Sequence, residues 1–180
     1  MIDIARIKSL LEQVPQPPGE PLPNGISDVE CDDLEARMGI PLPLEFRKWL
    51  NMSNGPCVGP GGFYGIRTQR PHLDIETHFV RHPSWKVRKW VPIAGDGCGN
   101  YYVLSTSYEF GRGKPVLFVD THVSSEEPAF IVASDIEHFL VFILERELGK
   151  KDWPFGAESV IRSDPRILEF TGVNLPWVQP

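Results

Sequence analysis

Residues 90–106, WVPIAGDGCGNYYVLST, contain two apolar runs separated by the glycine-rich motif GDGCGN. The runs WVPIA (90–94) and NYYVLST (100–106) are short and rich in β-branched and aromatic residues, which is typical of strands. Glycines at 95, 97 and 99 supply the positive-φ positions that a tight hairpin requires. The stretch therefore predicts two adjacent antiparallel strands, and we expect Asp96 to hold the bend through side-chain to backbone hydrogen bonds.

Further strands are predicted on both sides of this hairpin. Each segment is short, has a strand-like composition and is bounded by turn residues; the segments are GGFYGIRT (61–68), KPVLFVDTH (114–122) and EPAFIVAS (127–134). Residues 72–89 have no clear period, and we expect a helical turn followed by a loop there.

Helices are predicted where apolar residues recur at helical spacing and end signals are present. The first covers residues 3–14, with Asp3 available as N-cap; the second runs from the capping box Ser27–Glu30 to Gly39. The third follows Pro43 and ends at Asn54-Gly55, and the last runs from a cap at Ser134 or Asp135 to Gly149. Helices, then an antiparallel meander, then a helix indicate an α+β fold with an antiparallel sheet of about four to six strands flanked by helices.

Charge is unevenly distributed along the chain, whose formal net charge is −6. Residues 61–90 carry six Arg and Lys against two Asp and Glu, whereas residues 91–180 carry thirteen acidic residues against seven basic ones. This pattern fits either an ordinary solvated surface or an acidic face suited to a basic partner. Direct nucleic-acid binding is disfavoured, because no long basic stripe with interleaved aromatic residues occurs.

Three cysteines without a CxxC pair indicate no disulfide framework. The N-terminal residues lack a signal-peptide pattern, and no apolar run approaches the roughly 20 residues that span a bilayer. We therefore expect a cytoplasmic protein without a membrane span.

No arrangement of residues predicts catalysis, a metal or a cofactor. GDGCGN lacks the glycine spacing of a phosphate loop and the alternating oxygen ligands of a calcium loop. Cys98 lies between two glycines, as in a nucleophile turn, but the sequence places no base beside it. His78 and His82 are spaced for zinc on a helix, yet no third ligand is marked, and hydrogen-bonded or solvent-facing rings are expected instead. His138 is expected on the surface, and Glu126-Glu127 is expected to form a polar bend.

Three segments, taken in order, resemble the SUKH superfamily, the fold of the fungal cell-wall-assembly regulator (SMI/KNR) family. LEARMGIPLPLEFRKWLNMSNG (34–55) is similar to the family's opening motif, although Met38 replaces the commoner Leu. WVPIAGDGCGNYYVLS (90–105) is similar to its second motif, and the capped helix SDIEHFLVFIL fits the last. The landmark residues are Leu34, Gly39, Leu42, Pro43, Asn54, Gly55, Pro92, Ile93, Gly95, Asp96, Gly97, Gly99 and Asn100.

The resemblance implies a domain over residues 27–148. An N-terminal helix and proline-rich connector (1–26) would precede it, and a tail (149–180) would pack on it. The resemblance also implies a protein with no enzymatic role. Bacterial members are typically immunity proteins that bind and block a toxin domain, often a nuclease or deaminase, from a polymorphic or contact-dependent system. The alternative is a regulatory scaffold like the fungal members, and an unrecognised Cys98-dependent hydrolase is a third hypothesis.

Under the immunity hypothesis, the partner is a cognate toxin domain, with no nucleic acid or membrane bound directly. The expected contact surface is the sheet edge and its turns, because acidic and glycine-rich bends project there without disturbing the core. The candidate contact residues are Asp96, Asp120, Glu126 and Glu127, with Trp85 as an aromatic anchor. For each acidic residue alone, plain solvation is the competing interpretation.

Overall fold

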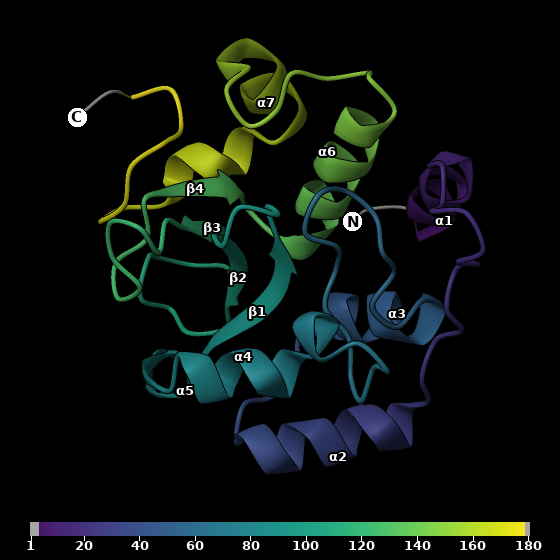
Figure 1. The fold of residues 1–180 in the computed structure, drawn as a ribbon. Helices are drawn as coiled ribbons and strands as arrows, with labels where there is room; N and C mark the ends of the chain where they lie inside the picture. The colour runs from purple at the N-terminus through teal and green to yellow at the C-terminus, as the bar shows by residue number, and fades with distance from the viewer. Residues whose placement is uncertain (1–3, 179–180) are drawn as a thin grey trace.

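A four-stranded antiparallel sheet forms the centre of the molecule in a computed structural model, which describes residues 4–178 (Figure 1). The strands are β1 (Trp90–Gly95), β2 (Tyr101–Ser105), β3 (Val116–Val119) and β4 (Phe130–Ala133), and they lie in chain order. Register pairs such as Val91 with Leu104 and Tyr102 with Phe118 are antiparallel. The predicted hairpin, the α+β class and the strand number are confirmed.

Helices surround this sheet (Figure 1). They are α1 (Ile4–Gln13), α2 (Asp28–Met38), α3 (Leu44–Met52), α4 (Ile75–Arg81), α5 (Ser84–Arg88), α6 (Ile136–Glu147) and α7 (Ala157–Ser163), with the 3₁₀ turns η1 (Pro71–Leu73) and η2 (Pro165–Glu169). α4 and α5 contact β1, whereas α1 and α3 contact α6. None of the helices within residues 4–178 has the length and apolar content needed to cross a bilayer.

The predicted helix ends are confirmed where the signal is local. Ser27 and Glu30 form a complete capping box at α2, and Gly39 adopts the left-handed conformation after it. Asp135 caps α6, its carboxylate accepting from the backbone N–H of His138. The predicted cap at Asp3 lies outside the described residues.

Two predictions between residues 61 and 89 are wrong. GGFYGIRT forms only isolated bridges, from Phe63 to Ala94 and from Gly65 to Asp74, because its glycines sit where backbones cross closely. A Cβ on Gly61 would lie 2.3 Å from the backbone of Gly95. The expected loop within 72–89 is instead η1, α4 and α5; Leu73, Phe79 and Trp85 of these elements are buried, and both α4 and α5 contact β1.

Both edges of the sheet are occupied. Beside β1, the N–H of Tyr64 donates to Ile93 O (2.8 Å), and the N–H of Gly95 donates to Gly62 O (3.1 Å). Beside β4, the N–H of Ile131 donates to Asn174 O (2.9 Å). The prediction that a sheet edge is available to a partner is therefore wrong, since chain segments already pair with both edges.

Aromatic rings join the layers of the core. The rings of Trp49 and Phe63 lie 4.9 Å apart, and that of Phe63 lies 6.1 Å from Phe139 of α6. Trp153, which follows α6, is buried 5.7 Å from Phe139 and donates from Nε1 to Val132 O. The residues after α6 thus contribute to the same core as the sheet.

Charged groups fix the N-terminal and C-terminal segments on α6. Glu145, which is buried, pairs with Arg6 of α1 (2.6 Å) and with Lys151 (3.1 Å). Asp164 is fully buried and accepts from the N–H of Ser134 (2.7 Å). The Nδ1–H of His138 donates to the Asp135 carboxylate (2.8 Å), and the side chain is 25% exposed, so this residue, expected on the surface, is half-buried.

Candidate partner-binding surface

Asp96 organises the bend between β1 and β2. One carboxylate oxygen accepts from the backbone N–H groups of Cys98 (2.7 Å) and Asn100 (3.0 Å), and the other accepts from the Asn100 side-chain amide (2.8 Å). The predicted hydrogen bonding of the bend is confirmed. Because both oxygens are engaged inside the loop, Asp96 shapes this surface and has little capacity left to bind a partner.

The bend is joined to the loop between β3 and β4. The side-chain oxygen of Asn100 accepts from Thr121 N–H (3.1 Å), and the Thr121 hydroxyl donates to Gly99 O (2.9 Å). A ring nitrogen of His122 lies 3.1 Å from Cys98 O. Residues 96–100 and 120–127 therefore form one continuous area, here named the loop surface.

Asp120 is a turn-forming residue at one side of the loop surface. Its side chain accepts from the N–H of His122 (3.0 Å), and its carbonyl accepts from Val123 and Ser124. The residue is half-buried, whereas the neighbouring Val123 is 84% exposed. Asp120 thus contributes negative charge while holding the turn that presents Val123 to solvent.

Glu126 and Glu127 are the exposed acidic residues of the loop surface. The Glu126 carboxylate accepts from the Ser84 hydroxyl (2.8 Å). The Glu127 side chain is 76% exposed, and the nearest cation, Arg88, lies 3.9 Å away. Arg88 also pairs with Glu109 and donates to Glu126 O, so Glu127 shares this cation with two other acceptors.

Trp85 is not an exposed anchor. It is completely buried, and its Nε1 donates to Ser125 O (2.8 Å). Its ring stacks on His82 at 4.1 Å and lies 5.0 Å from Tyr101. The prediction is wrong because α5 turns this ring inward against the sheet, where it fastens the loop surface to α5.

His122 is not among the residues predicted from the sequence; the fold brings it from 24 residues away to the backbone of Cys98. The hydrogen bond goes to the carbonyl oxygen of Cys98, whose thiol is exposed. Only the strand pairing creates this proximity, so no sequence spacing signals it.

The ring of His78 is part of the core packing. His78 is buried, stacks on Tyr64 at 4.0 Å and bonds to His72 O (3.0 Å). Burial lowers the pKa of His78 to about 4, so the ring is neutral near pH 7. Within residues 4–178, no group of three His, Cys, Asp or Glu side chains is arranged to hold a metal ion.

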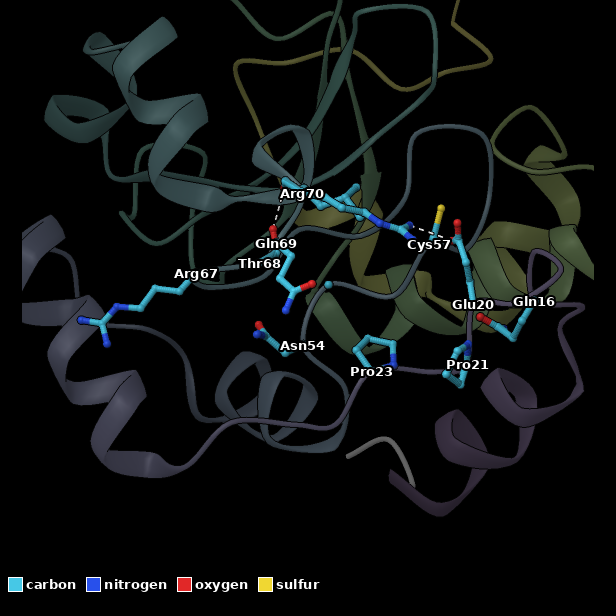
Figure 2. A pocket seen from close by; sticks show the side chains of 13 residues that line it. Gln16, Glu20, Pro21, Pro23, Asn54, Cys57, Arg67, Thr68, Gln69 and Arg70 are labelled. Atoms are coloured by element: carbon cyan, nitrogen blue, oxygen red, sulfur yellow. Dashed lines mark hydrogen bonds and ion pairs between the residues drawn. The ribbon is translucent and has the colours of Figure 1, made fainter.

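A pocket of about 390 Å³ lies beside the proline-rich connector (Figure 2). Its walls come from the connector, from the turn at Asn54 and from residues 67–73. Arg70 reaches across it to Glu20 (2.8 Å), as Figure 2 shows, while Arg67 points away. Since the charge of Arg70 is balanced by Glu20, the pocket is best explained as the seam where the connector meets the domain.

A larger cavity of about 580 Å³ lies at the end of the sheet opposite the loop surface. Its charged lining residues are Arg112, Lys114 and Arg166, facing Glu45, Asp135 and Glu137. The equal numbers of the two signs leave no net charge that would select a ligand.

Several landmark residues have clear structural roles. The Asn54 side chain both donates to Ile66 O (2.8 Å) and accepts from Ile66 N–H (2.7 Å). A Cβ on Gly65 would lie 2.3 Å from that amide oxygen, so glycine is required there. Gly55 and Gly97 have φ near 68° and 80°. These landmarks specify the backbone path.

The comparison with protein families agrees with these landmarks. The model of the SMI1 / KNR4 family (SUKH-1) matches residues 25–141, which include the loop surface. No curated protein matches the chain significantly.

Proposed function

The chain belongs to the SMI1 / KNR4 family (SUKH-1), and we propose that it is an immunity protein that binds one cognate toxin domain and blocks it. The family includes immunity proteins and is generally non-catalytic, and its members typically bind protein partners. In this proposal the toxin belongs to a polymorphic or contact-dependent system and is a nuclease or deaminase.

The observation that carries the choice of surface is the exposure of the loop surface at one end of the sheet. Glu126, Glu127 and Val123 project there, while hydrogen bonds from Asp96, Asn100 and Thr121 fix the backbone beneath them. A rigid base with exposed charge suits recognition, because little conformational entropy is lost on binding.

The charge of this surface suits a basic partner. Nucleases that act on polyanions present cations around their active sites, and acidic groups that approach those cations raise the association rate. Bound in this way, the immunity protein would exclude substrate without any chemistry of its own.

Co-expression tests the proposal. Cells would carry the toxin domain encoded beside this gene, with and without this chain, and growth would be measured after induction. Rescue by the wild-type chain is expected. The Glu126→Lys/Glu127→Lys variant should rescue less well than Glu12→Lys/Glu158→Lys, which makes the same change of charge at exposed positions on α1 and α7.

Equal killing with and without the chain would refute the immunity role and leave the regulatory scaffold as the alternative. Rescue that is unaffected by both charge reversals would keep the immunity role but move the contact away from Glu126 and Glu127. The two parts of the proposal thus have separate outcomes.

A further inference from the structure

The loop surface does not account for the excess of positive charge in residues 61–90. Some cations of this segment form ion pairs with carboxylates. Arg70 pairs with Glu20, and Arg88 pairs with Glu109. Of its two acids, Glu76 pairs with Arg37 of α2 (2.8 Å) and Asp74 caps α4. Neither acid forms an ion pair with another cation of the segment, although the charges of Arg67 and Lys86 add to the effect of Arg37 in lowering the pKa of Glu76.

Three of those cations lie on or directly after α4 and α5: Arg81, Lys86 and Lys89. All three are exposed, and within residues 4–178 none has a carboxylate within 4 Å. Val80 and Val87, their sequence neighbours, are 82% and 84% exposed. We name these five residues the basic face.

The two helices contact each other. The Lys86 ammonium of α5 lies 5.6 Å from the centre of the Phe79 ring of α4. Figure 1 shows α5 at the periphery of the molecule, beside α4, with α2 below α4 in this view. Cations placed beside exposed aliphatic groups are common where a partner supplies both charge and apolar surface.

Lys89 has an unusual backbone. Its φ of 57° and ψ of 43° are left-handed, a conformation that glycine adopts freely and lysine adopts with strain. Its carbonyl accepts from the Thr106 N–H (2.9 Å) and hydroxyl (3.0 Å), which fixes the backbone. Lysine at this position therefore adds a cation at a cost in local conformation.

We propose that the basic face is a second docking surface, which binds an acidic protein segment bearing aliphatic side chains. Carboxylates of that segment would pair with Arg81, Lys86 and Lys89, and its aliphatic groups would cover Val80 and Val87. Charge complementarity selects this occupant. Nucleic acid and anionic bilayers fit less well, because three cations on a chain of net charge −6 give little attraction to an extended polyanion.

The basic face adjoins the loop surface but does not depend on its function. Trp85 and Ser84 connect α5 to residues 125 and 126, whereas the basic face comprises the exposed residues of α4 and α5 and Lys89. The proposal therefore stands or falls separately from toxin binding.

A fluorescent peptide of repeated Glu-Glu-Leu units tests the proposal by anisotropy at low and high salt. The wild-type chain should bind it saturably, and more weakly at high salt. The variant Arg81→Gln/Lys86→Gln/Lys89→Gly should bind at least about threefold more weakly. Lys8→Gln/Lys48→Gln/Lys150→Gln, with the same change of charge at exposed positions elsewhere, should bind like wild type.

Lys89→Gly alone separates binding from folding, since it removes a cation and relieves the backbone strain. It should weaken peptide binding while leaving the urea midpoint unchanged or higher. The proposal is overturned if the peptide fails to bind, if the two triple variants bind equally, or if phosphatidylserine vesicles or duplex DNA bind more tightly than the peptide.

Discussion

At the scale of single residues, acidic side chains near the bend at 96–100 have different roles: one holds the backbone of the bend, and another is exposed to solvent. Asp96 is acidic and lies in a projecting turn, yet its carboxylate is used by three donors of its own loop. The Glu127 side chain, in contrast, is 76% exposed, and its ion-pair partner Arg88 lies 3.9 Å away. Residue type alone does not distinguish these two roles, because the difference lies in the donors that surround each carboxylate.

Gly97 gives a direct test of the bend. Its φ is 80°, and a Cβ there would lie 2.8 Å from the Cβ of Pro60. We expect Gly97→Val to lower the free energy of unfolding by about 1 kcal/mol or more, measured by urea denaturation. Gly172→Val is the control, because Gly172 has a similar φ of 79° but open space around its Cβ. Equal losses in the two variants would show that contact with Pro60 is unimportant.

His138 predicts a loss of stability as pH rises above 6.5. Burial alone would lower its pKa, but the hydrogen bond and charge of Asp135, together with the charge of Asp164, raise that pKa above 6.5. A raised pKa means that the contribution is complete below pH 6.5 and is lost as pH rises through the folded-state value. We expect His138→Gln to flatten the decline of unfolding free energy above that pH; an unchanged decline would contradict this.

His78 predicts the opposite dependence. Its pKa is lowered to about 4, chiefly by burial, so the unfolded chain binds a proton on this ring between that value and 6.5 while the folded chain does not. Stability should therefore fall as pH drops through this interval. In urea titrations, His78→Gln should show a shallower fall than the wild type, whatever its stability at neutral pH.

At the scale of elements, local signals predicted the structure well where they were self-contained. The capping box at Ser27, the cap at Asp135 and the glycines of the hairpin each act within a few residues, and each is confirmed. The prediction of a strand at residues 61–68 was wrong because the conformation of this segment is set by contact with Gly95 and Asn54, which are distant in sequence. The prediction of Trp85 as an aromatic anchor was wrong for the same reason, since packing on Tyr101 turns the ring inward.

The cover of the β4 edge gives a prediction for the C-terminal segment. The Ile131 N–H donates to Asn174 O, and Thr171 N–H donates to Phe110 O. Truncation after Phe170 would leave the N–H of Ile131 unpaired on an open edge, and we expect concentration-dependent aggregation by light scattering. Asn174→Ala keeps the backbone carbonyl and should remain monodisperse. Aggregation of both proteins would show that the side chain, and not the backbone pairing, protects the edge.

At the scale of the whole molecule, the segments outside the matched family region restrict where a partner can bind. α1 packs on α6 through Arg6 and Glu145, and residues 153–174 contact β4 through Trp153 and Asn174. The loop surface and the basic face remain uncovered by these segments. Sequence charge counts hinted at both surfaces, but only the ion pairs distinguish compensated residues such as Arg88 from exposed ones such as Lys89.

Charge reversal at the loop surface should act on the rate of association. Glu126→Lys/Glu127→Lys is expected to slow binding to a basic toxin domain roughly tenfold at low salt and to change dissociation less, because steering acts before contact. Added salt should slow the wild type in the same way. Surface-plasmon resonance would measure both rates, with Glu12→Lys/Glu158→Lys as the matched control. An association rate that changes neither with added salt nor with the charge reversal would contradict electrostatic steering.

Immunity by binding requires stoichiometric neutralisation of one toxin domain, and a titration of toxin activity measures that stoichiometry. The purified chain would be added in increasing amounts to a fixed amount of the toxin domain encoded beside it, and the remaining activity would be measured. We predict a linear fall to zero at one equivalent, as expected for tight binding well above the dissociation constant. Activity that persists unchanged beyond several equivalents would contradict the account.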